Sequence, residues 1–247
     1  MAFQIMQRFV WAIGICIAFP MAVYAQTCVL SSSVLLHSCQ ADMQVRLRVL
    51  PDSTQPDSTH LLTVAGTYSS GDRFGIEGLV LRDGTVISRR YQNWDGVLIL
   101  DKNAQPRLFH AKRVTLGGTG FNLKQTVSRA GFSAKAREMS VTVLQSHLLI
   151  STGQLDLKNI EAAPKFKRRL LVTFKDGSFA VWETEHAETL YDAARQVQVE
   201  LAPDMALNLD MGAYDYCVSG PKDAQKDCGL LLVSLDRLTN LLEFTKR

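Results

Sequence analysis

Four polar segments stand where β-strands are expected to end, and their side chains are of kinds that can perform hydrolysis. They are Gly66-Thr67-Tyr68, Gln145-Ser146-His147, Arg168-Arg169 and Asp210-Met211-Gly212. In domains built from strands, catalytic groups usually lie where strands end and loops converge. A carboxylate can activate water, and a guanidinium can bind a phosphate through two parallel hydrogen bonds. These residues are therefore candidates for a catalytic site.

Each of these residues also has a purely structural interpretation. Thr67 and Tyr68 can complete an edge strand, and Gln145 can pair with a neighbouring backbone group. Arg168 lies in a run of basic residues, which is typical of a solvated loop, and Asp210 can cap a turn. Residue type and spacing alone leave both interpretations open.

The elements that must position these residues are mainly strands. Asp-Gly turns predict β-hairpins over 77–88 and 169–184. Apolar and alternating runs predict further strands over 44–50, 60–68, 96–100, 107–114, 141–150 and 206–209. Mixed spacing predicts one or two helices over 122–139, one helix over 186–201, and a strand with a short C-terminal helix over 230–244. We expect a flexible turn at the glycine-rich residues 116–121.

The fold class that follows is α+β, with strand-rich mixed sheets, β-hairpins and two or three flanking helices. The 247 residues, of which 47% are hydrophobic, suffice for one sizeable core. We therefore expect a single domain over 26–247. Its 27 basic and 24 acidic residues give a balanced surface, which does not favour a nucleic-acid partner.

The N-terminus indicates export. Arg8 precedes an apolar run over 9–19, and small residues stand at the −3 and −1 positions before Gln26. This order is typical of a secretory signal peptide, and the run is too short to cross a bilayer. The sequence therefore predicts a signal peptide over 1–25 and a periplasmic or secreted protein without a membrane span after its removal. An uncleaved anchor is the alternative.

Four of the five cysteines follow the predicted signal peptide, and an even number in an exported chain favours disulfides. They are Cys28, Cys39, Cys217 and Cys228. Three pairings are possible. We expect the local pairs Cys28–Cys39 and Cys217–Cys228, because each brackets a short polar or irregular segment. A zinc site is the alternative, but neither pair has the short Cys-x-x-Cys spacing usual for zinc.

Five segments occur in an informative order: VAGTY, GLVLRDGTVIS, VLQSHLLISTGQ, RRLLVTFKDG and ALNLDMG. Their succession, over about residues 60–218, resembles the phosphodiester glycosidase family. That family shows a strand end like Asn-Gly-x-Phe-Phe, a glycine-bounded hairpin and a Gln-Ser-x-Pro-Leu-Leu segment. An arginine eight residues before an Asp-Gly turn and a strand ending in Leu-Asp-Gly-Gly follow. The resemblance implies a hydrolase that cleaves a sugar–phosphodiester linkage of the N-acetylglucosamine–phosphate type.

The resemblance also implies roles for individual residues. Asp210 would act as a base on water or would stabilise an oxocarbenium-like centre, and Arg168 would hold the phosphate. The substrate-binding residues would be Gly66, Thr67, Tyr68, Gln145, Ser146 and Gly212. The expelled phosphate monoester is a fair leaving group, so one carboxylate could suffice where ordinary glycosidases use two. His147 is either a proton donor or an ordinary strand histidine.

Three positions depart from the family pattern. Ala65 stands in place of asparagine, Leu148 in place of proline and Met211 in place of glycine. The loss of a site asparagine removes two hydrogen-bond donors and an acceptor. The departures favour an alternative, in which a non-catalytic relative uses the same cleft to bind an envelope glycan or a protein. A purely structural envelope protein is a third interpretation.

No cofactor is expected from the sequence. The histidines are scattered, without the spacing of a metal motif, and a divalent cation bound by carboxylates is left open. The expected partner is a sugar-phosphate or an envelope glycan that serves as substrate.

Overall fold

The computed structural model describes residues 31–38, 42–52, 57–70, 75–160, 162–211, 215–229 and 235–247. The predicted signal peptide, the pairing of Cys28 with Cys39 and the predicted site residue Gly212 therefore lie outside the described residues. In the described part of the chain, no helix has the length and apolar character needed to cross a membrane.

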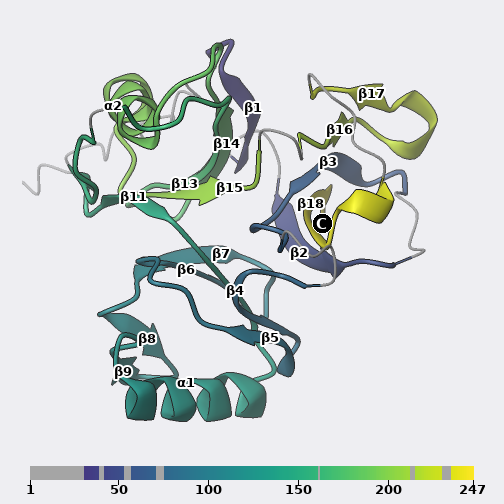
Figure 1. Ribbon diagram of the computed structural model, residues 1–247. Helices are drawn as coiled ribbons and strands as arrows, with labels where there is room; N and C mark the ends of the chain where they lie inside the picture. The colour runs from purple at the N-terminus through teal and green to yellow at the C-terminus, as the bar shows by residue number, and fades with distance from the viewer. Residues whose placement is uncertain are drawn as a thin grey trace, which may run out of the picture.

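The chain folds into three main sheets and one small hairpin (Figure 1). The first sheet has the order β1 (Val34–His37), β14 (Phe179–Glu183), β13 (Arg169–Thr173), β15 (Met205–Leu209), β11 (Leu148–Ser151) and β12 (Gln154–Leu155). The second has the order β5 (Thr85–Arg90), β4 (Gly78–Arg82), β10 (Thr142–Ser146), β6 (Gly96–Leu100) and β7 (Pro106–His110). The third has the order β17 (Lys226–Asp227), β16 (Cys217–Ser219), β3 (His60–Ala65), β18 (Asn240–Lys246) and β2 (Met43–Val49). The hairpin pairs β8 (Val114–Leu116) with β9 (Thr119–Phe121).

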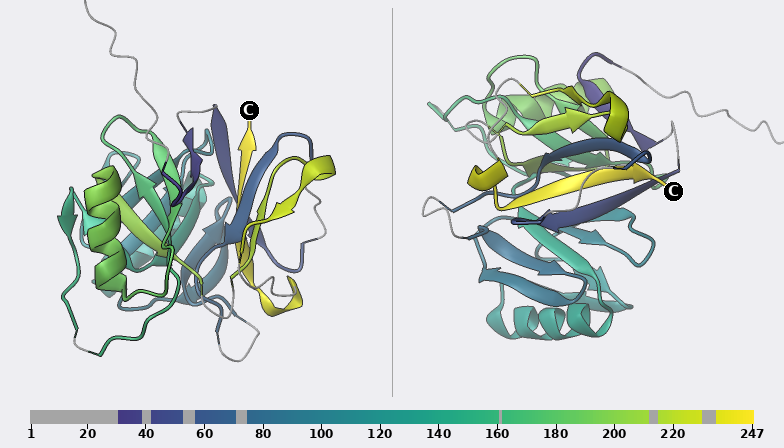
Figure 2. Two further views of the ribbon diagram at one scale, coloured as in Figure 1. Left: turned by 90° about the horizontal axis from the view of Figure 1, so that it is seen from above. Right: turned by 90° about the vertical axis from the view of Figure 1, so that its right-hand side faces the viewer.

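Two α-helices cover the outer faces of two sheets and lie at opposite ends of the molecule (Figures 1 and 2). Helix α1 (Thr126–Glu138) buries Phe132 and Ala136 against the second sheet, and α2 (Leu190–Leu201) buries Val197 against the first. Thr189 caps α2 by accepting a hydrogen bond from the backbone N–H of Asp192, which explains where this helix begins. Short 3-10 turns occupy Lys222–Ala224 and Leu235–Arg237.

The inner faces of the three sheets share one hydrophobic core. It contains Val64 from the third sheet, Leu98 and Leu144 from the second, and Leu171 and Leu207 from the first. This arrangement confirms the expected α+β class, although every strand pair in the described part of the chain is antiparallel rather than mixed in direction. The domain boundaries stay a prediction.

Both Asp-Gly hairpins are confirmed. Asp83 and Gly84 have φ angles of 50° and 77°, and Gly177 has a φ of 86°. A left-handed conformation at the turn matches the twist of the flanking strands, which is why this dipeptide predicts hairpins well. The glycine-rich segment also forms a tight hairpin, since Gly117 and Gly118 link β8 to β9 with φ angles of 56° and 77°.

Two predicted elements are wrong in detail. The expected strand over 141–150 is two strands, because the chain leaves the second sheet after Ser146 and enters the first at Leu148. The C-terminal element is the strand β18, and a 3-10 turn precedes it in place of the expected short C-terminal helix. Strand β18 pairs with β2 on one side and with β3 on the other. The sequence of this segment alone does not reveal these partners.

Two glycines permit close approaches, Gly66 within the third sheet and Gly96 between the second sheet and the first. A Cβ atom on Gly66 would stand 2.1 Å from Oδ1 of Asn240, whose side chain accepts from the N–H of Thr67 and donates to its carbonyl. A Cβ atom on Gly96 would stand 2.2 Å from Leu207 and 2.8 Å from the carbonyl oxygen of Ser146. At Gly66 a Cβ atom would clash with a side chain, whereas at Gly96 it would also clash with backbone.

Gly66→Ala should lower the free energy of unfolding by about 1–3 kcal/mol, the usual cost of overpacking a core. Most of this cost should vanish in an Asn240→Ala background, because the next atom, a methyl carbon of Leu144, lies at an ordinary 3.6 Å. Urea unfolding of the two single variants and the double variant measures the coupling. Additive costs would contradict this account. Gly120→Ala, where nothing lies within 4 Å, is the matched control.

Candidate functional site

The predicted site residues surround Tyr68, which follows β3 at a corner where all three sheets meet. The hydroxyl of Tyr68 accepts a hydrogen bond from Nδ2 of Asn208 in β15. Burial raises the pKa of Tyr68, the negative charge of Asp210 raises it further, and the positive charge of Arg168 lowers it. The two predicted catalytic residues therefore both lie near this one phenol.

Asp210 is a buried carboxylate at the end of β15. Its backbone N–H donates to the carbonyl of Gly66 at 2.7 Å, and its Oδ2 accepts from the backbone N–H of Ser69 at 3.3 Å. Burial raises the pKa of Asp210 to about 7, although the N–H groups of Ser69 and Met211 favour its ionised form. Burial therefore outweighs these two backbone contacts, and the pKa of the Asp210 carboxyl group lies near neutrality.

Arg168 is buried, in contrast to the solvated-loop alternative, and stands just before β13. Its Nε donates to the carbonyl of Glu188 at 3.1 Å and its Nη2 to the carbonyl of Pro164 at 2.9 Å. The guanidinium also lies over the ring of Phe166, 5.1 Å from its centroid. Burial lowers the pKa of Arg168 and the nearby Tyr68 raises it. The neighbouring loops thus fix the direction of this cation.

Arg168 and Asp210 do not form an ion pair with each other in the described part of the chain. Both act on Tyr68, yet Arg168 is not among the causes that shift the pKa of Asp210. Opposite charges in direct contact would lower the pKa of the carboxyl group. Arg168 and Asp210 are therefore not in direct contact.

Gln145 has all four hydrogen-bonding positions of its amide engaged by backbone. Its Oε1 accepts from the N–H groups of Leu79 and Gln92, both at 3.1 Å, and its Nε2 donates to the carbonyls of Gln92 and Trp94 at 2.7 and 3.1 Å. An amide has two donors and a twofold acceptor, so none is left over. Gln145 thus fixes the loop that carries Trp94, and its predicted contact with substrate stays a prediction.

Three other predicted substrate-binding residues, Gly66, Thr67 and Ser146, make hydrogen bonds that join the sheets. The hydroxyl of Thr67 donates to the carbonyl of Gln145 at 2.7 Å, and that of Ser146 to the carbonyl of Asn208 at 2.6 Å. Gly66 accepts the N–H of Asp210. All of these bonds stay within the protein, so the structure gives these residues a supporting position.

Four residues of this region were not among the predicted site residues. His147 lies at the crossing from β10 to β11, Trp94 in the loop before β6, Asn208 within β15, and Asn240 at the start of β18. The Oδ1 atom of Asn208 is buried and has no hydrogen-bond partner among the described residues. Only His147 carried a signal, because it follows Gln-Ser in a segment that resembles a family motif.

His147 is neutral at physiological pH. Burial lowers its pKa to about 4, the charge of Arg168 lowers it as well, and Asp95 raises it. A group with this pKa is not in the imidazolium form at neutral pH, so the arrangement does not favour His147 as a general acid.

Buried ion pairs hold the chain from Asp215 onward. Arg169, fully buried, donates to the carboxylates of Glu183 and Asp215 and to the carbonyl of Tyr216. The predicted disulfide between Cys217 and Cys228 is present, with a Cα–Cα distance of 5.0 Å. These contacts anchor the chain on the far side of residues 212–214.

The described residues contain one cluster of metal-ligand types: Asp95, His110 and Asp156, with ligand atoms within 4.8 Å of one another. Nε2 of His110 lies 3.6 Å from Oδ1 of Asp156, and Nδ1 accepts from the N–H of Lys112. A histidine that binds metal usually donates its second ring N–H, so this tautomer places a proton on the nitrogen that a cation would need. Lys124 already neutralises Asp95 at 2.9 Å. The cluster fits an ion-pair network better than a metal centre.

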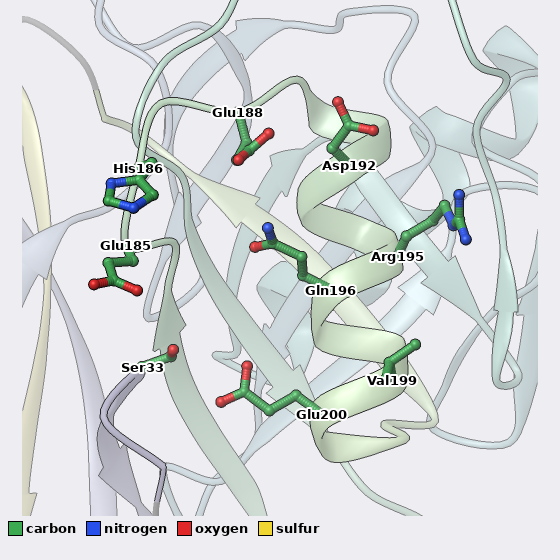
Figure 3. A pocket seen from close by; sticks show the side chains of 9 residues that line it. All are labelled: Ser33, Glu185, His186, Glu188, Asp192, Arg195, Gln196, Val199 and Glu200. Atoms are coloured by element: carbon green, nitrogen blue, oxygen red, sulfur yellow. The ribbon is translucent and has the colours of Figure 1, made fainter.

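A separate surface groove of about 660 Å³ lies between α2 and residues 185–188 (Figure 3). Glu188, Asp192 and Glu200 are among the residues that line it. Its lining contains none of the predicted site residues. The connection is indirect, through the carbonyl of Glu188, to which Arg168 donates.

No family model matches this chain, and no curated protein matches it. Among solved structures, it is similar to the zebrafish N-acetylglucosamine-1-phosphodiester alpha-N-acetylglucosaminidase catalytic domain auto-inhibited by pro-peptide. The two are 12% identical with a TM-score of 0.55, and the match covers 83% of this chain and 73% of that chain. A hypothetical protein from Synechocystis is 12% identical with a TM-score of 0.44, covering 83% and 57% of the two chains. The first likeness shows a distant relationship of fold.

The titration of Asp210 should make the protein less stable as the pH rises. Its pKa is about 7 in the folded protein against an ordinary value of 3.8 for an aspartate, so the folded state holds the proton more tightly. This contribution is therefore fully present below pH 4 and is lost between about pH 4 and 7, at about 1.4 kcal/mol per pH unit. Asp210→Asn should remove that slope in denaturant unfolding measured at several pH values.

Asp223→Asn is the control, because it removes an exposed carboxylate far from the core. It should keep the wild-type dependence on pH. An Asp210→Asn variant that loses stability between pH 4 and 7 as steeply as the wild type would show that Asp210 ionises normally.

Proposed function

We propose that this protein is an exported hydrolase of the phosphodiester glycosidase type, which cleaves a sugar–phosphodiester linkage such as N-acetylglucosamine–phosphate. One observation carries the proposal. Arg168 and Asp210 are distant in sequence, yet the charges of both shift the pKa of Tyr68, and the two form no ion pair with each other in the described part of the chain. The distant likeness in fold to an N-acetylglucosamine-1-phosphodiester alpha-N-acetylglucosaminidase supports it. An unpaired cation and acid at one corner suit a substrate that has a phosphate next to the bond to be broken.

Arg168 would bind the phosphate. Two of its nitrogens are fixed by the carbonyls of Glu188 and Pro164, and Nη1 makes no hydrogen bond to a described residue. A guanidinium already oriented by its own protein loses little freedom when it binds an anion. Neutralisation of the phosphate charge would also make the monoester a better leaving group.

Asp210 would act at the anomeric carbon. As a carboxylate it would take a proton from the attacking water, or it would stabilise positive charge that develops on the sugar. A general base works best when its pKa lies near the working pH, and burial brings the pKa of Asp210 to about 7. The hydroxyl of Tyr68, held by Asn208, lies within reach of both charges and would donate to the substrate.

Export is part of the proposal. It rests on the signal-peptide pattern over residues 1–25 and on the Cys217–Cys228 disulfide, which is typical of oxidising compartments. The alternative function is a non-catalytic relative that binds an envelope glycan or a protein. It is favoured by the two backbone carbonyls that already occupy Arg168 and by the substitutions Ala65 and Met211 relative to the family pattern.

Purified protein should release N-acetylglucosamine from a GlcNAc-α-1-phosphodiester. Asp210→Asn should lower kcat/KM by roughly 10²–10⁴-fold, the usual contribution of a positioned acid or base. Arg168→Lys should raise KM, because lysine keeps the charge but loses the planar fork. Release of sugar, followed by chromatography, measures both.

Arg195→Ala, an exposed arginine on α2, is the matched control and should leave the rate unchanged. Unimpaired turnover by Asp210→Asn would remove the acid from the mechanism. Binding of the substrate without release of sugar by the wild type, over pH 4–9, would establish the alternative function.

The rate should depend on pH in the direction that a base requires. Because Asp210 has a pKa of about 7 in the folded protein, kcat/KM should rise with pH and level off above that value. His147, with a pKa of about 4, should add no second ionisation near neutrality. A rate that falls steadily from pH 5 to 8 would instead assign Asp210 the role of an acid.

A further inference from the structure

Three aromatic rings from separate parts of the chain meet beside the charged groups. Tyr68, Trp94 and His147 have ring centroids 5.0 Å apart for Tyr68 and Trp94, 5.1 Å for Trp94 and His147, and 5.8 Å for Tyr68 and His147. Each of the three residues is largely buried but keeps some exposed surface. Aromatic residues on a soluble protein usually bury their faces, so a partly open group of three next to a buried cation and acid indicates a binding surface.

Trp94 is held more firmly than a loop residue usually is. Its carbonyl and both backbone groups of Gln92 bind the amide of Gln145. Its ring packs on Gly78, where a Cβ atom would stand 3.1 Å from the indole, and Gly78 has a φ of 90°. A side chain at this glycine would displace the ring. The buried Gln145 and the positive φ of Gly78 thus both help to fix the position of the Trp94 indole.

We propose that Trp94, with His147 and Tyr68 beside it, forms a pyranose-binding subsite, and that Gln145 is its positioning residue. The proposal rests on the proposed function and specifies which part of the substrate each side chain takes. The electron-rich indole face would take the C–H face of the sugar ring, whose hydrogens carry partial positive charge. The phosphate would then point toward Arg168, and the anomeric carbon would lie near Tyr68 and Asp210.

The neutral state of His147 suits this role. His147 lies near Arg168. A positive charge on the imidazole would repel the guanidinium, and the ring would no longer be apolar. A neutral imidazole adds an aromatic surface and one N–H donor for a sugar hydroxyl. Asn208, whose Oδ1 is buried and without a partner, fixes the hydroxyl of Tyr68 on the other side of the group.

The test uses two probes that separate the sugar from the phosphate: methyl α-N-acetylglucosaminide and dimethyl phosphate. Trp94→Ala should weaken binding of the glycoside at least tenfold and leave binding of dimethyl phosphate within twofold. Arg168→Lys should weaken binding of dimethyl phosphate at least tenfold and leave binding of the glycoside within twofold. NMR titration of the full chain follows both, and Tyr191→Ala, a half-buried aromatic residue on α2, is the matched control.

The indole N–H signals give a readout that a merely structural role would not move. The signal of Trp94, assigned with Trp94→Phe, should shift on addition of the glycoside. That of Trp182, buried and bonded to Glu200, should not. Gln145→Glu cannot donate to the carbonyls of Gln92 and Trp94, so it should raise KM for the phosphodiester several-fold with little change in kcat.

Equal affinity of the wild type and Trp94→Ala for the glycoside would overturn the subsite. That result leaves hydrolysis of the phosphodiester intact, so it is distinct from failure of the proposed function. If glycoside binding depends on Trp94 but the protein releases no sugar from the phosphodiester, the subsite would be supported and the proposed hydrolase activity would be overturned.

Discussion

The hydrogen bond from the backbone N–H of Asp210 to the carbonyl of Gly66 joins the first sheet to the third, and the site depends on it. It places the last residue of β15 beside the turn after β3, so the carboxyl group and Tyr68 share one corner. Thr67 then bonds to the carbonyl of Gln145, which brings in the second sheet. Since sheets pack through side chains and rarely bond edge to edge at their ends, these two contacts define the corner more tightly than the core does.

The shape of the corner follows from the small residues around it. Gly66 lets the amide of Asn240 bond both backbone groups of Thr67, and Gly96 lets β6 approach Leu207. Asn240 thereby acts as a substitute for a missing strand partner. The family pattern has an asparagine at the position of Ala65, and here asparagines appear elsewhere, at Asn208 and Asn240. The asparagines near this corner therefore stand at other positions than in the pattern that the sequence resembles.

The sequence predicts the strands and their ends well but not the purpose of each polar side chain. Period-two patterns and Asp-Gly turns are local, so both hairpins and the strand before Asp210 follow from residue order. Gln145 is different, because whether an amide faces substrate or backbone depends on a loop fifty residues earlier in the chain. Trp94 lies in that loop, outside any periodic run. The break at His147 is also invisible, since the apolar pattern continues while the chain changes sheets.

The concentration of unfavourable groups at this corner is itself an argument for function. A buried acid whose pKa is about 7, a desolvated guanidinium and an amide oxygen without a partner all reduce the stability of the fold. Elsewhere the buried charges are neutralised directly, as Arg169 is by Glu183 and Asp215. Arg168 and Asp210 form no such ion pair in the described part of the chain. Buried ionisable groups with perturbed pKa values are typical of sites that bind a ligand.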